Sequence, residues 1–454
     1  MFTYKTLVPI AMGFLLASFP TCLLKTIEES LAVDGIGNIV ADSQLGFDDV
    51  QNMVEDFQQG CDNQDADCSK GFVFPDLPNR YDGASTPEII RRNGYPVEIH
   101  SVTTDDGYIL EMHRIPGGKG INRKADPKKK PVFVLHGLLT TSADWVLAGP
   151  NISLAFLLAD KGYDVWLGNS RGNTYSRKHV KFSTEEYRFW NFSFHEMGLF
   201  DAPACIDHIL RLTKQDKVSY IGHSMGTTIF FVMASERPEY NDKILVQLSL
   251  GPVAYYFHTR SPVKLLAPFT PGLVKIADVL FHGELLSRSF ILNEVLKAFC
   301  TLNKAQMIFC RELLSLIFGR DNEQLQYTTI PAIVGHDPAG VSTKTILHNA
   351  QFINRLNTFR RFDYGLANPQ HYNSLEPPDY NISAIRSKVA LFYGPNDLLA
   401  NEIDVKLFYS QLPNPIGLFK VNLTKFSHLD FLWAKDVRSL VYNQLVQIMH
   451  DNNQ

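Results

Sequence analysis

Short apolar runs alternate with amphipathic stretches through most of the chain, and this alternation predicts strands and helices in turn. The runs expected to form strands are 132–135, 164–167, 218–221, 244–250, 389–393 and 418–421. Helical spacing of apolar residues is found at 153–158, 203–212 and 437–449. Continuous β-branched and aromatic runs are typical of parallel strands buried on both faces. The pattern therefore predicts the α/β class, with a mostly parallel central sheet and helices on both faces.

Two stretches depart from this alternation. Residues 97–102 and 108–115 flank Thr103-Thr104-Asp105-Asp106-Gly107, which predicts a β-hairpin at the start of the core. Residues 253–372 are rich in Leu, Phe, Ile and Pro at helical spacing. We expect an inserted helical cap there, which divides the core into residues 81–252 and 373–454.

The first 80 residues differ from the rest in composition. Lys5 precedes an apolar run at 7–19 that is too short to cross a bilayer, so residues 1–19 are predicted to be a signal peptide. A buried helix or an uncleaved anchor is the alternative. Residues 26–76 hold twelve acidic residues against one basic residue, so 20–80 are predicted to be an acidic extension and are a candidate propeptide. No second long apolar run follows, which predicts no transmembrane segment in the mature chain.

The overall composition excludes several classes of protein. The 454 residues carry a net charge of −4, and 45% are hydrophobic and 20% charged, which excludes wholesale disorder. This charge balance also argues against a nucleic-acid partner. The sequence has no C-x-x-C pair, zinc-type cluster or Walker loop, so neither a metal nor a cofactor is expected. The basic run at 123–130 is predicted to be a solvated loop.

Sequons and cysteines agree with export. Asn151, Asn191, Asn381 and Asn422 begin N-x-S/T patterns and are candidate glycosylation sites. If Cys22 is removed with the signal, two local disulfides are plausible in an oxidising compartment. Their candidate partners are Cys61 with Cys68 and Cys300 with Cys310. Cys205 then remains, and its apolar helical surroundings predict an inert buried thiol.

The candidate chemistry centres on Gly222-His-Ser-Met-Gly226, which lies between a predicted strand and an apolar helix. This strand–turn–helix context is the one that a nucleophile elbow requires. Glycines are needed in it because the turn is strained and tightly packed. Ser224 is therefore the candidate nucleophile, at a helix N-terminus where N–H groups favour developing negative charge.

A serine nucleophile needs a base, and the base needs a group to orient it. Asp397 lies in the loop after the strand at 389–393, and His428 follows the last strand, so we assign them as orienting acid and general base. Asp404 is the rival acid, although it lies at the start of a predicted helix. The backbone N–H groups of Met225 and Leu138 are the expected oxyanion donors.

At these residues the sequence resembles the acid lipases, the family of gastric lipase and lysosomal acid lipase. The resemblance runs from about residue 87 to 446. It rests on the segments at 136–145, 168–176, 189–194, 222–226, 261–269 and 428–431. It implies an α/β-hydrolase core under a helical cap, cofactor-free hydrolysis of triacylglycerols and cholesteryl esters, and a triad of Ser224, Asp397 and His428. It also implies oxyanion donors at Leu138 and Met225.

These observations predict a serine ester hydrolase that acts on lipid esters at a lipid–water interface through an acyl-enzyme intermediate. The expected location is extracellular, with the lysosome as the alternative. Two other functions remain open, namely a non-enzymatic lipid carrier on the same scaffold and an esterase for other lipid esters. The oligomeric state is left open.

Overall fold

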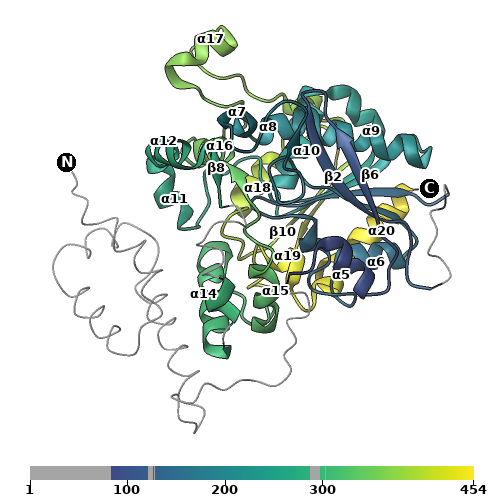
Figure 1. Cartoon of the computed structure of the whole chain (residues 1–454). Coiled ribbons are helices and arrows are strands. Elements are labelled where there is room, and N and C mark those ends of the chain that lie inside the picture. The colour runs from purple at the N-terminus through teal and green to yellow at the C-terminus, as the bar shows by residue number, and fades with distance from the viewer. Residues whose placement is uncertain (1–82, 121–125, 127, 287–296, 302, 454) are drawn as a thin grey trace, which may run out of the picture. The chain divides into compact units, whose positions relative to one another are not determined.

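The structure is a computed structural model that describes residues 83–120, 126, 128–286, 297–301 and 303–453 (Figure 1). The chain separates into two units, Met1–Cys68 and Ser69–Gln454, and all the described residues belong to the second. The predicted signal peptide, the acidic extension and the candidate Cys61–Cys68 disulfide lie outside the described residues.

The core of the described unit is a single mixed sheet with the strand order β1-β2-β4-β3-β6-β7-β10-β11, and β5 pairs with β2 beside this path. The strands from β4 to β11 along this order are parallel, whereas β2 is antiparallel to β1, β4 and β5. The strands are β1 Glu98–Thr103, β2 Tyr108–Ile115, β3 Pro131–Leu135, β4 Asp164–Leu167, β5 Lys178–His179, β6 Val218–His223, β7 Ile244–Leu250, β10 Val389–Tyr393 and β11 Pro415–Lys420.

The sheet confirms the strands expected from the apolar runs, and β1 and β2 form the expected hairpin. Its turn closes through Gly107 N–H to the Thr104 carbonyl (2.9 Å), with Gly107 at φ +99°. The short β5 was not predicted, because two residues carry no periodic signal. The last strand also begins earlier than expected, since Pro415–Gly417 give no apolar run.

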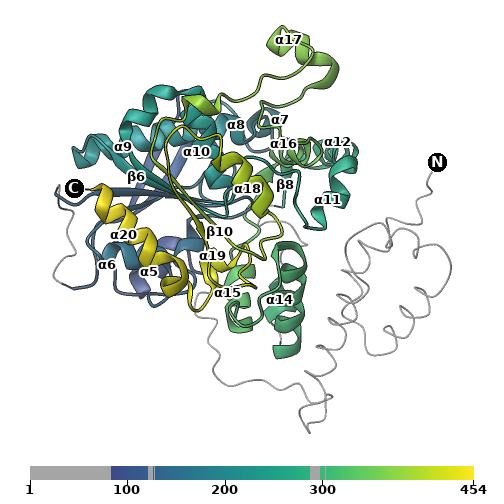
Figure 2. The same ribbon diagram turned by 180° about the vertical axis from the view of Figure 1, so that it is seen from behind.

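Helices cover both faces of the sheet, as Figures 1 and 2 show. The helices α9, α10 and α18 contribute to one buried apolar cluster, whereas α5, α6, α19 and α20 contribute to the other. In α9 the buried positions Ala202, Cys205, Ile206 and Ile209 follow the helical period that the sequence showed. The helices are α5 Thr86–Arg92, α6 Leu154–Asp160, α7 Tyr187–Trp190, α8 Phe194–Glu196, α9 Ala202–Thr213, α10 Met225–Glu236, α18 Glu402–Tyr409, α19 Asp430–Trp433 and α20 Asn443–Asn452.

Between β7 and β10 the chain is mainly helical, and we call this part the cap. Its described helices are α11 Val263–Leu266, α12 Thr270–Phe281, α14 Lys304–Phe318, α15 Ile330–Val334, α16 Thr343–Ile353 and α17 Asn368–Tyr372. A two-stranded sheet of β8 Glu284–Leu285 and β9 Val341–Ser342 joins them, and it was not predicted. The expected disulfide between Cys300 and Cys310 is present and ties the middle of α14 to the helical residues that precede this helix.

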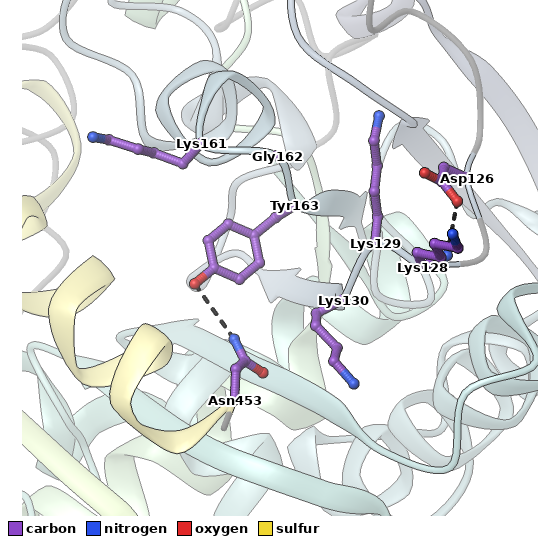
Figure 3. Close-up of a pocket in the computed structure, with 8 residues that line it drawn as sticks. All are labelled: Asp126, Lys128, Lys129, Lys130, Lys161, Gly162, Tyr163 and Asn453. Atoms are coloured by element: carbon purple, nitrogen blue, oxygen red, sulfur yellow. Dashed lines mark hydrogen bonds between the residues drawn. The ribbon is translucent and has the colours of Figure 1, made fainter.

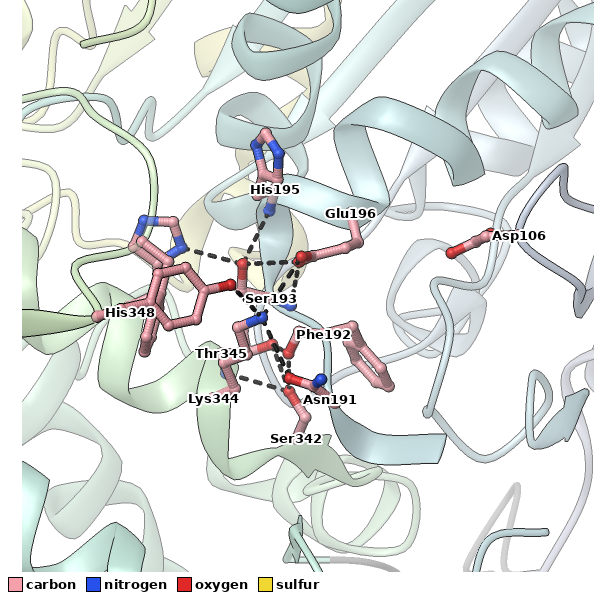
Figure 4. Close-up of polar contacts among 12 residues, drawn as sticks. Asp106, Asn191, Phe192, Ser193, His195, Glu196, Ser342, Lys344, Thr345 and His348 are labelled. Atoms are coloured by element: carbon pink, nitrogen blue, oxygen red, sulfur yellow. Dashed lines mark hydrogen bonds and ion pairs between the residues drawn. The ribbon is translucent and has the colours of Figure 1, made fainter. Parts of the chain in front are cut away.

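A largely buried polar cluster, with Asn191 at its exposed edge, joins cap helix α16 to the core segment 191–196 (Figure 4). Lys344 lies 3.5 Å from Glu196 and donates to Asn191 Oδ1 (3.2 Å). Burial raises the pKa of Glu196, but the Lys344 ammonium and backbone N–H groups outweigh this and hold that pKa at about 2. His348 also hydrogen-bonds to Ser193 Oγ (3.0 Å), so this end of the cap is firmly fixed to the core.

The cap region formed by α11 and α12, which are labelled on the left in Figure 1, exposes apolar side chains to solvent. Leu266, Phe269, Leu273, Ile276 and Leu280 are each between 45% and 67% exposed. Leu273, Ile276 and Leu280 lie along one side of α12 at a spacing of three or four residues, and Leu266 and Phe269 lie just before this helix. We call this set of five residues the α12 apolar row. Single exposed apolar residues are ordinary on protein surfaces, whereas a contiguous row is not.

Candidate active site

Ser224 is the single residue between strand β6 and helix α10, and its backbone is strained. Its φ of +52° and ψ of −122° lie outside the regions that residues with a side chain normally occupy. The two flanking glycines permit this turn. A Cβ on Gly226 would lie 2.4 Å from the Leu135 carbonyl oxygen, and one on Gly222 would lie 2.7 Å from the backbone of Gly226. The sequence therefore folds into the tight strand–turn–helix that its G-x-S-x-G pattern predicted.

Asp397 and His428, which are 31 residues apart in the chain, meet at the carboxyl ends of β10 and β11. His428 Nδ1–H donates to Asp397 Oδ2 at 2.7 Å, and both side chains are almost fully buried. The other oxygen, Oδ1, accepts the N–H groups of Leu399 and Ala400 at 2.9 and 2.8 Å. These bonds hold the imidazole in the tautomer whose Nε2 carries a lone pair, which is the form that a general base needs.

The rival acid Asp404 is engaged elsewhere. It lies in α18, as expected, and its two oxygens bind the ring Nδ1 and the backbone N–H of His258 at 2.6 and 2.8 Å. Of the two candidate acids, the structure therefore brings only Asp397 to His428.

Ser224 and His428 are held on the same edge of the sheet. Ser224 N–H donates to the Leu250 carbonyl (3.0 Å). The next residue, Gly251, lies so near the imidazole that a Cβ there would be 3.0 Å from it. Within the described residues, His428 Nε2 is buried and forms no hydrogen bond, so no bond joins it to the Ser224 hydroxyl. Such bonds are often long in unliganded enzymes and tighten when substrate binds.

The backbone N–H groups of Leu138 and Met225 come from the loop after β3 and from the first residue of α10. The N–H of a first helical residue has no acceptor within its own helix. The loop reaches the elbow closely, because a Cβ on Gly137 would lie 3.2 Å from Ser224 Cβ. The same loop contains Leu139, whose φ of +66° marks a sharp turn. The arrangement can offer two donors beside Ser224.

His136 and His223 support these loops. His136 Nδ1–H donates to the Gly137 carbonyl (2.8 Å), and Nε2 accepts the Ser170 N–H (3.1 Å). Burial lowers the pKa of His136 to about 4, so it remains neutral over most of the pH range. His223 Nε2–H donates to the His428 carbonyl (3.1 Å), and burial and the nearby His428 ring lower the pKa of His223.

Two buried pairs of acids lie near the site, and neither was predicted from the sequence. Asp430, two residues after His428, lies beside Asp321 of the cap and accepts the Ser427 N–H (2.6 Å). Asp144, which follows the oxyanion loop, lies beside Asp337 of the cap. Burial raises the pKa of Asp144 and of Asp430, and the carboxylate of Asp321 adds to the effect on Asp430. Each pair joins the cap to the core. The raised pKa values favour the protonated form of Asp430 in one pair and of Asp144 in the other.

A cavity of about 280 Å³ lies elsewhere on the molecule (Figure 3). Its lining includes Lys130 and Tyr163, which directly precede β3 and β4. It therefore lies near the amino ends of the parallel strands, whereas Ser224, Asp397 and His428 lie at their carboxyl ends. This lysine-lined cavity is separate from the candidate active site.

The remaining candidate residues fall as follows in the described part of the chain. The asparagines at 151, 191, 381 and 422 are all exposed, so each is accessible for modification. Cys205 is unpaired and buried, and burial raises the pKa of its thiol, which fits an inert residue. Among the helices of the described ranges, none has the length and apolar character needed to span a bilayer.

Comparisons with known proteins identify the family of this chain. Residues 86–149 match the family described as "Partial alpha/beta-hydrolase lipase region", and residues 130–267 match "alpha/beta hydrolase fold". Lipase 3 of Drosophila melanogaster is 42% identical over 80% of this chain and 92% of the relative. The gastric triacylglycerol lipase of Bos taurus is 40% identical over 79% and 89% of the two chains. Lipase member K of Homo sapiens is 39% identical over 80% and 90%.

The fold, the strained serine turn and these relatives lead to one assignment. The chain belongs to the acid lipase family of α/β-hydrolases and is a carboxylic ester hydrolase.

Proposed function

We propose that this enzyme is a lipase that hydrolyses triacylglycerols and cholesteryl esters, with Ser224 as nucleophile, His428 as general base and Asp397 as orienting acid. The observation that carries this proposal is the buried 2.7 Å bond between His428 and Asp397, which leaves the imidazole Nε2 without a hydrogen bond among the described residues, at the sheet edge that also carries the strained Ser224 turn. The substrate class is supported by the names of the relatives, which include gastric triacylglycerol lipases.

The mechanism follows from the positions of these groups. Ser224 Oγ attacks the ester carbonyl while His428 Nε2 takes its proton, and Asp397 stabilises the imidazolium that forms. The N–H groups of Leu138 and Met225 hold the oxyanion, and the loss of one such donor costs about 3 kcal/mol in the barrier. His428 then returns the proton to the leaving alcohol. Water repeats the sequence on the acyl-enzyme and releases the fatty acid.

The role of the cap in this proposal is to provide apolar surface against which the acyl chain of the substrate is buried. Each buried CH₂ group is worth about 0.8 kcal/mol, so a long acyl chain gains substantially from an apolar lining. Apolar side chains of the cap lie close to the site, since the Phe318 ring stacks over the His428 ring with centroids 6.1 Å apart. We expect turnover of p-nitrophenyl esters to rise with acyl chain length, and equal turnover across lengths would contradict this role.

The decisive experiment compares Ser224→Ala with the wild type on triolein and cholesteryl oleate, at acid and neutral pH. Ser410→Ala is the matched control, because this serine is exposed and lies in another part of the core. Loss of turnover in Ser224→Ala alone, with an unchanged melting temperature, supports the proposal. Full activity of Ser224→Ala would refute the assignment of the nucleophile.

A lipid carrier on the same scaffold would bind lipid without a reactive serine. A fluorophosphonate probe distinguishes the two functions, because covalent labelling needs an activated nucleophile. Labelling of the wild type and none of Ser224→Ala is expected. The exposed sequons and the disulfide are features of exported proteins, so they support an extracellular location for this enzyme, with the lysosome as the alternative.

A further inference from the structure

The end of cap helix α14 contacts both loops that carry the acid and the base. The carbonyl of Phe318, the last residue of α14, accepts the N–H of His428 (3.2 Å) and the N–H of Leu398 (3.4 Å). One carbonyl of the cap thus bonds to the base itself and to the residue after the acid. Any shift of this carbonyl would move the two loops relative to each other.

The next cap residue, Gly319, packs tightly against the loop after β10 that contains Asp397, which we call the acid loop. Its φ is +113°, and a Cβ there would lie 2.1 Å from the carbonyl oxygen of Asn396 and 3.0 Å from Ser427 Cβ. Only glycine combines this backbone conformation with so close an approach. The contact brings the cap main chain directly onto the residue that precedes the orienting acid.

Asn396 completes the connection with its side chain. Its amide Nδ2 donates to the Arg320 carbonyl of the cap (2.9 Å) and to the Lys425 carbonyl of the base loop (3.3 Å). Its backbone N–H donates to the Phe426 carbonyl (3.1 Å). A single half-buried residue therefore bonds to the cap and to the loop that precedes His428, while its own peptide continues into Asp397.

We propose that Asn396 is a positioning residue that sets the distance between Asp397 and His428 by joining the cap to both loops. It touches no reacting atom and acts through the 2.7 Å bond of the pair. The inference rests on the proposed function, because it assigns a role within the same triad. Misplacing a catalytic group by about 1 Å costs about 100-fold in rate, and this sets the scale of the expected effect.

The test is Asn396→Ala, measured as kcat and KM on a soluble short-chain p-nitrophenyl ester. We expect kcat to fall about 100-fold with little change in KM, because substrate binding does not use this residue. Asn396→Ser, which keeps a single donor, is expected to give an intermediate kcat, and it provides a second variant if Asn396→Ala folds poorly.

The matched control is Asn241→Ala. Asn241 also donates to main-chain carbonyls, those of Ala234 and Pro238 among them, and it accepts the Ser387 N–H (2.9 Å). It joins the segments that precede β7 and β10 and therefore lies at the amino ends of these strands, whereas the site lies at the carboxyl ends. Asn241→Ala should lower the melting temperature at least as much as Asn396→Ala and leave kcat unchanged.

A double-variant cycle separates positioning from general destabilisation. If Asn396 acts through Asp397, Asn396→Ala should reduce kcat little further in an Asp397→Asn background. An unchanged kcat in Asn396→Ala, or the same fold-loss in both backgrounds, would overturn the inference. A wild-type enzyme that neither hydrolyses esters nor reacts with a fluorophosphonate would instead refute the proposed function.

Discussion

The buried pair of Asp430 and Asp321 makes the stability of this protein depend on pH in a calculable way. Burial and the neighbouring carboxylate raise the pKa of Asp430 in the folded state, whereas an aspartate in the unfolded chain titrates near pKa 3.9. Above about pH 4 the folded protein therefore keeps a proton that the unfolded chain has released. The contribution to stability is fully present in acid and is lost as the pH rises towards the folded pKa.

The magnitude follows from the proton count. Because the folded state holds one extra proton, the free energy of unfolding falls by about 1.4 kcal/mol for each unit by which the pH rises, or by about 2.7 kcal/mol from pH 5 to pH 7. Asp430→Asn should remove this dependence, because an amide keeps the acceptor for Ser427 N–H and can donate to Asp321, as the protonated acid does.

The assay is urea unfolding of the wild type and Asp430→Asn between pH 5 and pH 7. We expect the variant to gain about 2.7 kcal/mol on the wild type across this interval. Asp242→Asn is the control, since its side chain is 81% exposed and should leave the slope unchanged. If the difference between wild type and Asp430→Asn stays constant with pH, the pair does not hold a proton and the reasoning fails.

Three further predictions follow from the site and the cap. Asp397→Asn should lower kcat about 10⁴-fold through the wrong imidazole tautomer, and a loss below tenfold would contradict the role of the acid. Gly226→Ala should abolish fluorophosphonate labelling and cost about 3 kcal/mol in thermal unfolding, because its Cβ would meet the Leu135 carbonyl at 2.4 Å. Cys310→Ser should cost about 3 kcal/mol of stability, and added reductant should reproduce this loss in the wild type but not in the variant.

Sequence reasoning succeeded where the signal was periodic or tied to one turn. The apolar runs predicted the strands of the core, and the G-x-S-x-G pattern predicted the turn at Ser224, since only glycine fits on either side of it. Chain order, position after the last strands and the resemblance to the acid lipases selected His428 and Asp397, which the structure joins by a hydrogen bond. These successes share one cause, because the geometry of a single turn and the order of elements along the chain can both be read directly from the sequence.

The parts that could not be predicted are contacts between distant segments. The carbonyl of Phe318 that accepts the His428 N–H is a main-chain group, so no side-chain pattern marks it. The Asp430–Asp321 pair joins residues that are far apart in sequence, and each is an ordinary aspartate when read alone. Asn396 stands directly before the acid, but an asparagine in a turn has a local explanation that hides its contact with the cap.

The α12 apolar row has a practical consequence for handling the purified enzyme. Side chains such as Phe269 and Ile276 are 67% and 60% exposed, so they will adsorb to plastic, glass and the air–buffer boundary. Dilute stock solutions should then lose protein to the vessel, and apparent specific activity should rise when detergent or carrier albumin is added. Rates measured without such additives would report how much enzyme stayed in solution rather than how fast each molecule works.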